Sequence, residues 1–150
     1  MLNVLLGFFL VILTSYTSVF ALFFLVKYLS GWKELEQIYP ASRTDETGPK
    51  RYFVSLRLNW LSYNNSAKLE ALNGGLRIQQ TFFGFFGTHK PAFIPWTEIF
   101  YVEKTENPGV FVRNEYLFRL SRLNRLSLRI PSRVGSWILE QKNFYTLPRS

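Results

Sequence analysis

The residue types that carry most enzyme chemistry are scarce in this chain. It has one histidine, His89, one aspartate, Asp45, and no cysteine. A thiol nucleophile is therefore excluded, and a serine–histidine–aspartate site would have to bring His89 and Asp45 together from separate segments. His89 lies in a Gly-Thr-His-Lys-Pro stretch, where we expect an ordinary exposed loop residue. The composition argues against an enzyme and predicts no catalytic residue.

Metal-ligand and phosphate-loop patterns are also missing from the sequence. The nearest approach to a metal site is Glu103 with Glu106, and we expect both to face water at the end of a strand. The glycines at 74–75 and 84–87 fit turns and do not have the spacing of a phosphate loop. The sequence therefore predicts no metal and no cofactor.

The strongest chemical signal is the positive charge of the C-terminal part. Residues 113–150 hold seven arginines and one lysine against two glutamates, in a chain of formal net charge +8. Strand alternation predicts a hairpin with Arg119 and Arg129 on one outer face and Arg122 and Arg125 at its tip. Such a face can contact anionic lipid headgroups or an acidic partner, or it can simply keep the domain soluble. Nucleic-acid binding is disfavoured because the neighbouring aromatic residues fall in core phase.

A cluster of phenylalanines is unusual for a loop. It consists of Phe82, Phe83, Phe85 and Phe86. Four phenylalanines in five residues are hard to bury on one side of a turn, so we expect a hydrophobic tip that contacts the membrane or a partner. The alternative is that Phe82 and one neighbour fill the core.

An uncharged apolar segment opens the chain. Residues 2–26 contain no charged side chain and, as a helix, reach roughly 37 Å, which is enough to cross a bilayer. No basic residue precedes the run and no good cleavage site follows it, so a retained anchor at 1–28 is favoured over a cleaved signal peptide. Lys27, Lys33 and Arg43 follow the run and favour an N-terminus outside and a domain in the cytoplasm, at the inner membrane.

Two further features of this region suggest contacts. Tyr28 and Trp32 are of the types that settle at the lipid headgroup level, so we expect both to be interface anchors. Small residues recur along one side of the apolar helix, where another helix could approach. They are Gly7, Thr14, Ser18 and Ala21. If they form a packing stripe, they imply a homodimer or a subunit of a larger assembly; otherwise they reflect composition alone.

The rest of the chain indicates a juxtamembrane helix and linker at 29–50 and a β domain at 51–150. Alternating apolar residues, turns and prolines predict about seven short antiparallel strands followed by a helix. The expected strands are 52–60, 68–72, 76–83, 92–96, 98–104, 116–122 and 126–130, and the expected helix is 132–143. The expected turns include 63–66 and 123–125. This order predicts a mainly β protein: a small sandwich or barrel with a C-terminal helix.

Three stretches carry a resemblance to a known family. Gly-Trp-Lys-Glu-Leu-Glu-Gln-Ile-Tyr-Pro at 31–40, Asn-Gly-Gly-Leu-Arg-Ile at 73–78 and Ala-Phe-Ile-Pro-Trp-Thr-Glu-Ile at 92–99 resemble small bacterial membrane-anchored pleckstrin-homology-like (PH/GRAM-like) proteins. The resemblance covers about 31–143 and implies a PH-like β-barrel or sandwich with a binding or scaffolding role. Residues 61–67 hold no Lys or Arg, so the basic loop that grips phosphoinositides in lipid-binding members is not evident.

These observations favour a non-enzymatic, single-pass membrane protein whose domain binds a partner at the membrane surface, as an accessory subunit of a membrane complex. The expected partners are membrane lipids and a membrane protein or a second copy of the chain. The alternative is a module that binds anionic lipid, and a small enzyme is the least favoured. No nucleic acid and no cofactor are expected.

Overall fold

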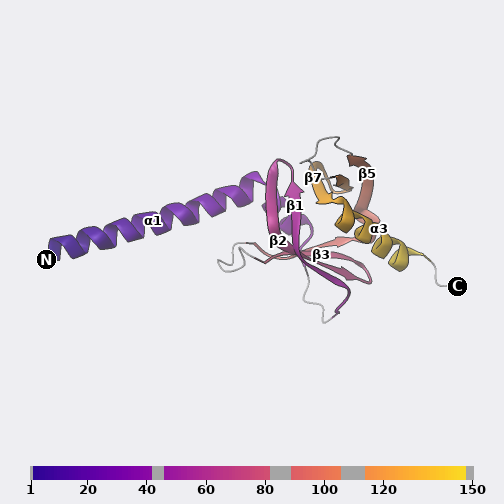
Figure 1. Cartoon of the computed structure of the whole chain (residues 1–150), viewed down its shortest axis with the longest axis horizontal. Helices are drawn as coiled ribbons and strands as arrows, with labels where there is room; N and C mark the ends of the chain where they lie inside the picture. Colours follow the sequence, from indigo (N-terminus) through magenta and orange to yellow (C-terminus); the bar gives the residue numbers. More distant parts are fainter. Residues whose placement is uncertain (1, 42–45, 82–88, 106–113, 148–150) are drawn as a thin grey trace.

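The structure is a computed structural model that describes residues 2–41, 46–81, 89–105 and 114–147, without the side chains at 2–5, 23 and 26. Helix α1 (Leu2–Leu29) stands away from the rest of the molecule as a single rod (Figure 1). Its segment Leu6–Leu29 is long and apolar enough to cross a membrane, with a mean hydropathy of 2.3, and its described apolar residues are exposed. The expected N-terminal apolar helix is therefore confirmed, and it continues three residues beyond the uncharged run.

The remaining elements form a β domain with two further helices. A short helix, α2 (Trp32–Ile38), follows α1 almost directly. The strands are β1 (Lys50–Leu58), β2 (Leu61–Leu72), β3 (Gly75–Gln80), β4 (Ala92–Pro95), β5 (Ile99–Thr105), β6 (Glu115–Leu120) and β7 (Leu123–Pro131). A 3-10 turn, η2 (Trp96–Glu98), joins β4 to β5, and helix α3 (Ser132–Thr146) ends the described chain.

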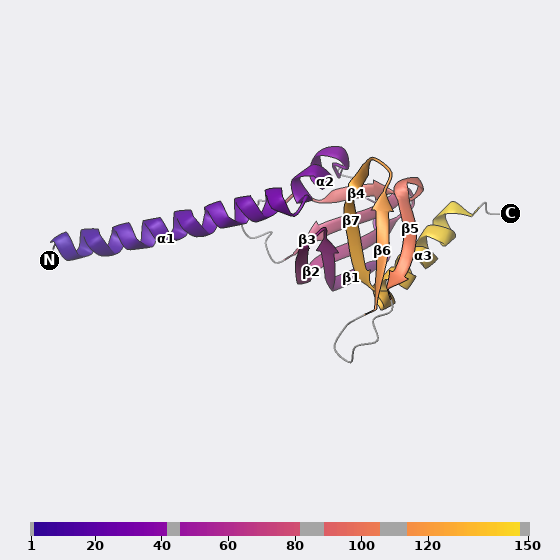
Figure 2. The same cartoon turned by 90° about the horizontal axis from the view of Figure 1, so that it is seen from above.

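The seven strands form one antiparallel sheet in the order β4-β3-β2-β1-β7-β6-β5. The sheet bends into two layers, so that β5, β6 and β7 cross the direction of β1, β2 and β3 (Figure 2). Strand β1 joins the layers, because it pairs with β2 along its length and with β7 only near its end, at Arg57 and Leu58. In the described part of the chain β4 and β5 do not pair with each other, so the sheet is open. The expected antiparallel β fold with a C-terminal helix is confirmed, whereas closure into a barrel is not.

The hydrophobic core lies between the two layers and includes both short helices. Alternate residues of the strands supply most of it, as period-2 patterning requires. Helix α2 contributes Trp32 and Leu35, and α3 contributes Trp137 and Ile138. Trp32, Leu35 and Tyr39 come from the segment expected to be a juxtamembrane helix and linker, so residues 32–39 of it contribute to the folded core.

The first predicted turn is wrong. Residues 63–66 do not form a turn but lie inside β2, and the chain reverses at Asn59 and Trp60 instead. Asn59 has a φ of 53°, in the left-handed region that asparagine adopts more readily than most residues. Residues 63–66, which have the residue types of a turn, instead include a β-bulge in which Asn65 has a φ of 47°. The alternation of Val54, Leu56, Leu58 and Trp60 predicts that all four lie on one side of a strand, with Trp60 in core phase. The strand ends at Leu58, however, and Trp60 lies exposed in the turn.

The second predicted turn is also displaced. Residues 123–125 begin β7, and the reversal between β6 and β7 lies at Ser121 and Arg122. Arg122 is therefore at the hairpin tip as expected, whereas Arg125 lies on the strand. The predicted strand 76–83 ends at Gln80, and Phe82, Phe83, Phe85, Phe86 and the linker residue Asp45 lie outside the described residues.

Candidate functional site

Helix α1 meets the β domain through a compact joint rather than a linker. Between α1 and α2 the chain turns at Gly31, whose φ is 82°. A Cβ atom at this position would lie 2.9 Å from Leu126 Cδ1 and 3.2 Å from Asn59 Nδ2. Glycine both adopts this left-handed backbone without strain and allows the close approach to β7 and to the β1–β2 turn. The end of α1 is thus pressed directly against the sheet.

Three aromatic rings surround the joint. Trp32 is fully buried, and its ring centroid lies 5.3 Å from those of both Tyr63 and His89. The Tyr63 hydroxyl donates to Ser30 Oγ at 2.6 Å, and Ser30 Oγ donates to the Lys27 carbonyl oxygen at 3.2 Å. Trp32 Nε1 donates to the Lys90 carbonyl oxygen at 3.3 Å. These contacts therefore connect α1, α2, β2 and the segment before β4.

The electrostatics of the joint fit a structural role. Lys27 Nζ lies 2.7 Å from Glu36 Oε2, and the second oxygen of Glu36 accepts the Lys90 backbone N–H. Burial raises the pKa of the Tyr63 phenol to about 12, so it remains a neutral donor to Ser30. Burial, with a smaller effect of the Lys27 charge, lowers the pKa of His89 to about 4, so its imidazole is neutral at pH 7.

The joint corrects two predictions. His89 is not an exposed loop residue: only 7% of it is accessible, because it packs edge-on against Trp32 and Tyr63. Trp32 is not an interface anchor either, because α2 folds back onto the sheet and buries it. Tyr28 does remain exposed at the end of α1, with Lys33 Nζ 3.8 Å from its ring centroid and hydrogen-bonded to its hydroxyl. The contacts that Tyr63, Ser30 and Gly31 make at the joint had no sequence signal, since they depend on segments that are distant in the chain.

A second candidate site is the arginine face, which we define as Arg119, Arg125 and Arg129 with Phe100 beside them. The register pairs Arg119 with Ser127 and Leu117 with Arg129, so Arg119 and Arg129 share the outer side of β6 and β7, as predicted. Phe100 pairs with Arg119 and is half exposed. Among the described residues, no salt bridge joins Arg119, Arg125 or Arg129 to a carboxylate.

Arg122 belongs to a different arrangement. Its Nη2 lies 2.7 Å from Glu98 Oε1, and its backbone N–H donates to the Tyr39 hydroxyl at 3.3 Å. Tyr39 in turn donates to Glu98 Oε2 at 2.7 Å. Arg122 therefore helps to tie the β6–β7 turn to η2 and to the end of α2, although its side chain is largely exposed.

The arginine face is directed away to the side of the α1 axis and not along that axis. Figure 2 looks directly onto β5, β6 and β7, while α1 runs across the view. The outer side of these strands therefore faces across the axis of α1 rather than along it. Because the joint holds α1 against the sheet, the face has a fixed direction relative to that axis.

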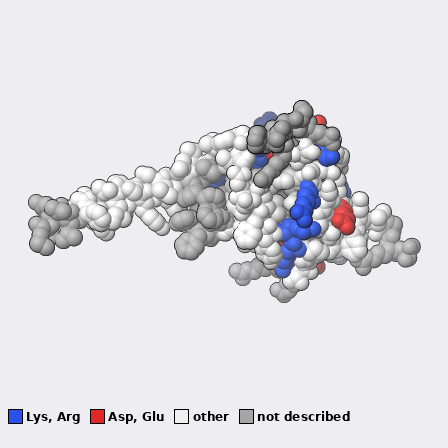
Figure 3. Space-filling model, viewed as in Figure 1, with Lys and Arg blue, Asp and Glu red and all other residues white. Residues whose placement is uncertain are grey.

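A further basic strip was not predicted from the sequence. Figure 3 shows Lys and Arg side chains gathered across the face of the β domain that is seen in Figure 1. Two basic residues of the β1–β2 pair stack on aromatic rings: Arg51 lies 5.5 Å from the Trp137 ring and Lys68 lies 5.5 Å from the Tyr52 ring. Arg51 lies on β1 and Lys68 on β2, so no local sequence pattern links the two residues.

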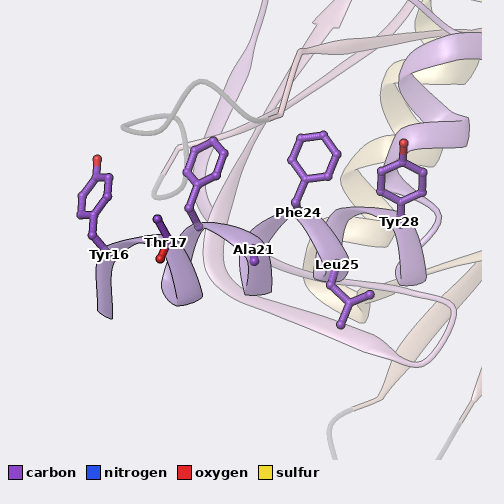
Figure 4. A pocket seen from close by; sticks show the side chains of 7 residues that line it. Tyr16, Thr17, Ala21, Phe24, Leu25 and Tyr28 are labelled. Carbon is purple, nitrogen blue, oxygen red and sulfur yellow. The ribbon is translucent and has the colours of Figure 1, made fainter. Parts of the chain in front are cut away.

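Helix α1 carries an apolar groove and a set of small residues, and Ala21 belongs to both. An apolar groove of about 630 Å³ runs along one side of the helix (Figure 4), and its lining residues are Tyr16, Thr17, Phe20, Ala21, Phe24, Leu25 and Tyr28. Of the predicted stripe, Gly7, Thr14, Ser18 and Ala21 are all exposed. The hydroxyls of Thr14 and Ser18 donate to backbone carbonyls of α1 itself, so neither requires a hydrogen-bond acceptor on another helix.

No group of three or more His, Cys, Asp or Glu residues that could hold a metal occurs within 2–41, 46–81, 89–105 and 114–147. By its fold the chain is a mainly antiparallel β protein with a long apolar N-terminal helix and a C-terminal helix. No protein family, no curated protein and no solved structure matches it.

Proposed function

We propose that this chain is a non-enzymatic, single-pass membrane protein whose β domain binds a partner protein at the membrane surface, as an accessory subunit of a membrane complex. The observation that carries the proposal is the arginine face: arginines free of salt bridges among the described residues, next to the exposed ring of Phe100 and turned to the side of α1. In this proposal α1 spans the inner membrane, and Lys27 and Lys33 keep the domain in the cytoplasm.

The fold supports a PH-like assignment of the domain. Seven antiparallel strands and then a helix are the order that the resemblance implies, and the two layers cross as in Figure 2. Such a domain offers binding surfaces and needs no catalytic residues. The neutral, buried imidazole of His89 is used by the joint, which is consistent with a binding role.

The direction of the arginine face favours a protein over lipid. With α1 across the bilayer, headgroups lie around the end of α1, whereas the arginine face turns to the side. A surface that faces in this direction can contact a protein that lies beside the anchor at the membrane. Arginine binds carboxylates through two parallel hydrogen bonds, so an acidic segment of a neighbouring membrane protein fits this face.

The test is a charge reversal in the full-length chain. Arg119→Glu with Arg129→Glu should abolish co-purification of a stoichiometric membrane protein in mild detergent, as measured by mass spectrometry. The matched control is Arg51→Glu with Arg133→Glu, which makes the same change in charge at exposed arginines elsewhere, and it should keep the partner. If the wild-type chain purifies alone with anionic lipid, or if both double variants lose the partner equally, the proposal is wrong.

The alternative function, binding of anionic lipid, has one observation in its favour. Figure 3 shows lysine and arginine side chains gathered on the face of the β domain that is seen in Figure 1. Each basic residue near an anionic membrane contributes about 1 kcal/mol. If this alternative holds, Arg51→Glu with Arg133→Glu should weaken binding of the β domain to anionic lipid in nanodiscs. Arg119→Glu with Arg129→Glu should leave that binding unchanged.

A further inference from the structure

The β1–β2 turn is fixed beside the end of α1. The Asn59 side-chain amide lies next to Gly31, 3.2 Å from the position that a Cβ atom would take there. Asn59 is itself held by β7: its backbone N–H donates to the Ser127 carbonyl oxygen at 2.9 Å, and its Oδ1 accepts the Ser127 N–H at 3.0 Å. In Figure 1 the tip of the β1–β2 hairpin lies beside the C-terminal end of α1.

Trp60 occupies this turn and is exposed. Of its surface 64% is accessible, whereas the other three tryptophans of the chain are between 0% and 7% accessible. A tryptophan side chain carries roughly 150–250 Å² of largely apolar surface, which is unfavourable in water. The turn itself needs only the left-handed residue, Asn59. Neither the core nor the turn therefore accounts for an indole at this position.

We infer that Trp60 is a membrane contact: its indole lies among the lipid headgroups of the leaflet in which α1 ends. Tryptophan prefers this layer, because its ring is apolar and its N–H still reaches polar groups. The position fits, since the Asn59 side chain lies next to Gly31, and Gly31 is only two residues beyond the end of the apolar segment at Leu29. Trp60 thus takes the role that the sequence suggested for Trp32.

The inference rests on the proposed function, because it requires α1 to lie in the bilayer. It adds a second point of attachment on the domain itself. One helix end leaves a domain free to rock on the membrane, whereas a helix end together with a turn on the sheet restricts its tilt. The restriction keeps the arginine face directed to the side, where a partner protein would be.

The experiment measures tryptophan fluorescence of the full-length chain in nanodiscs of phosphatidylcholine, with and without bromine atoms on the upper part of the acyl chains. The difference between wild type and Trp60→Phe isolates the emission of Trp60, because the other three tryptophans are present in both chains. The matched control is Phe144→Trp in the Trp60→Phe background. Position 144 is 58% exposed and lies on α3, whose C-terminal end points away from α1 (Figure 1).

We expect brominated lipid to remove most of the Trp60 emission, and acrylamide in the water to quench it weakly. The indole at position 144 should show the reverse. If Trp60 behaves like position 144 while the chain still resists extraction by alkaline carbonate, the membrane contact is refuted and the anchor stands. If carbonate extracts the chain, the proposed membrane anchor fails, and the contact fails with it.

Discussion

Replacing Gly31 by alanine tests whether α1 and the β domain form one rigid unit. A residue other than glycine at a φ of 82° costs about 1–2 kcal/mol in backbone strain. The added Cβ would also lie 2.9 Å from Leu126 Cδ1 and 3.2 Å from Asn59 Nδ2. The Leu126 methyl group is at the end of a flexible side chain and can move, whereas Asn59 is held by two hydrogen bonds to Ser127. We therefore expect the free energy of unfolding to fall by about 1–2 kcal/mol, mostly from backbone strain.

The assay is urea unfolding of the full-length chain in detergent micelles, followed by tryptophan fluorescence. Trp32 lies in the joint, next to Gly31, and so reports on this region. Gly74→Ala is the matched control. Gly74 has no positive φ, and a Cβ atom there would meet only Phe93 Cζ, at an ordinary contact distance of 3.5 Å. This control should change the free energy of unfolding by no more than about 0.5 kcal/mol.

The refuting result is a Gly31→Ala chain that unfolds at the same urea concentration as Gly74→Ala. In that case the chain would pass from α1 to α2 without using the left-handed conformation. The fixed direction of the arginine face, which depends on the joint, would then have no support.

Two further predictions concern buried polar residues of the β domain. Because the pKa of His89 is about 4 in the folded chain and 6.5 ordinarily, the unfolded chain binds the extra proton between these values. The free energy of unfolding should therefore decrease by about 3 kcal/mol as the pH falls from above 6.5 to 4. His89→Gln should make the free energy of unfolding depend less on pH, as measured by unfolding curves across this range. Tyr39→Phe removes the 2.7 Å hydrogen bond to the Glu98 carboxylate and should lower the free energy of unfolding by about 1.5–3 kcal/mol. The Glu98 carboxylate also accepts a hydrogen bond from Ser121 Oγ at 3.0 Å. A thermal melt that is unchanged in Tyr39→Phe would show that Arg122 and Ser121 are sufficient to hold this carboxylate.

Much of the architecture follows from local pattern alone. The uncharged run that becomes α1 has only one stable form in a nonpolar environment, and its composition is sufficient to predict it. Alternation also placed Arg119 and Arg129 on one side of their hairpin, because side chains in a strand alternate with period two whatever lies around them. Helix α3 was predicted at nearly its full length for the same reason, from its apolar spacing.

Tertiary structure determined which aromatic residues at the joint are buried and which are exposed. Period two fixes a side only while the strand lasts, so the reversal at Asn59 left Trp60 exposed although its alternation matched the core. Trp32 had the sequence signature of an interface residue, but the left-handed turn at Gly31 folds α2 onto the sheet and buries it. His89 became a neutral core residue because Trp32 and Tyr63, from segments far apart in the chain, pack around it. Local sequence pattern by itself determined most of the helices and strands, whereas contacts between distant segments determined which aromatic residues are buried and which are exposed.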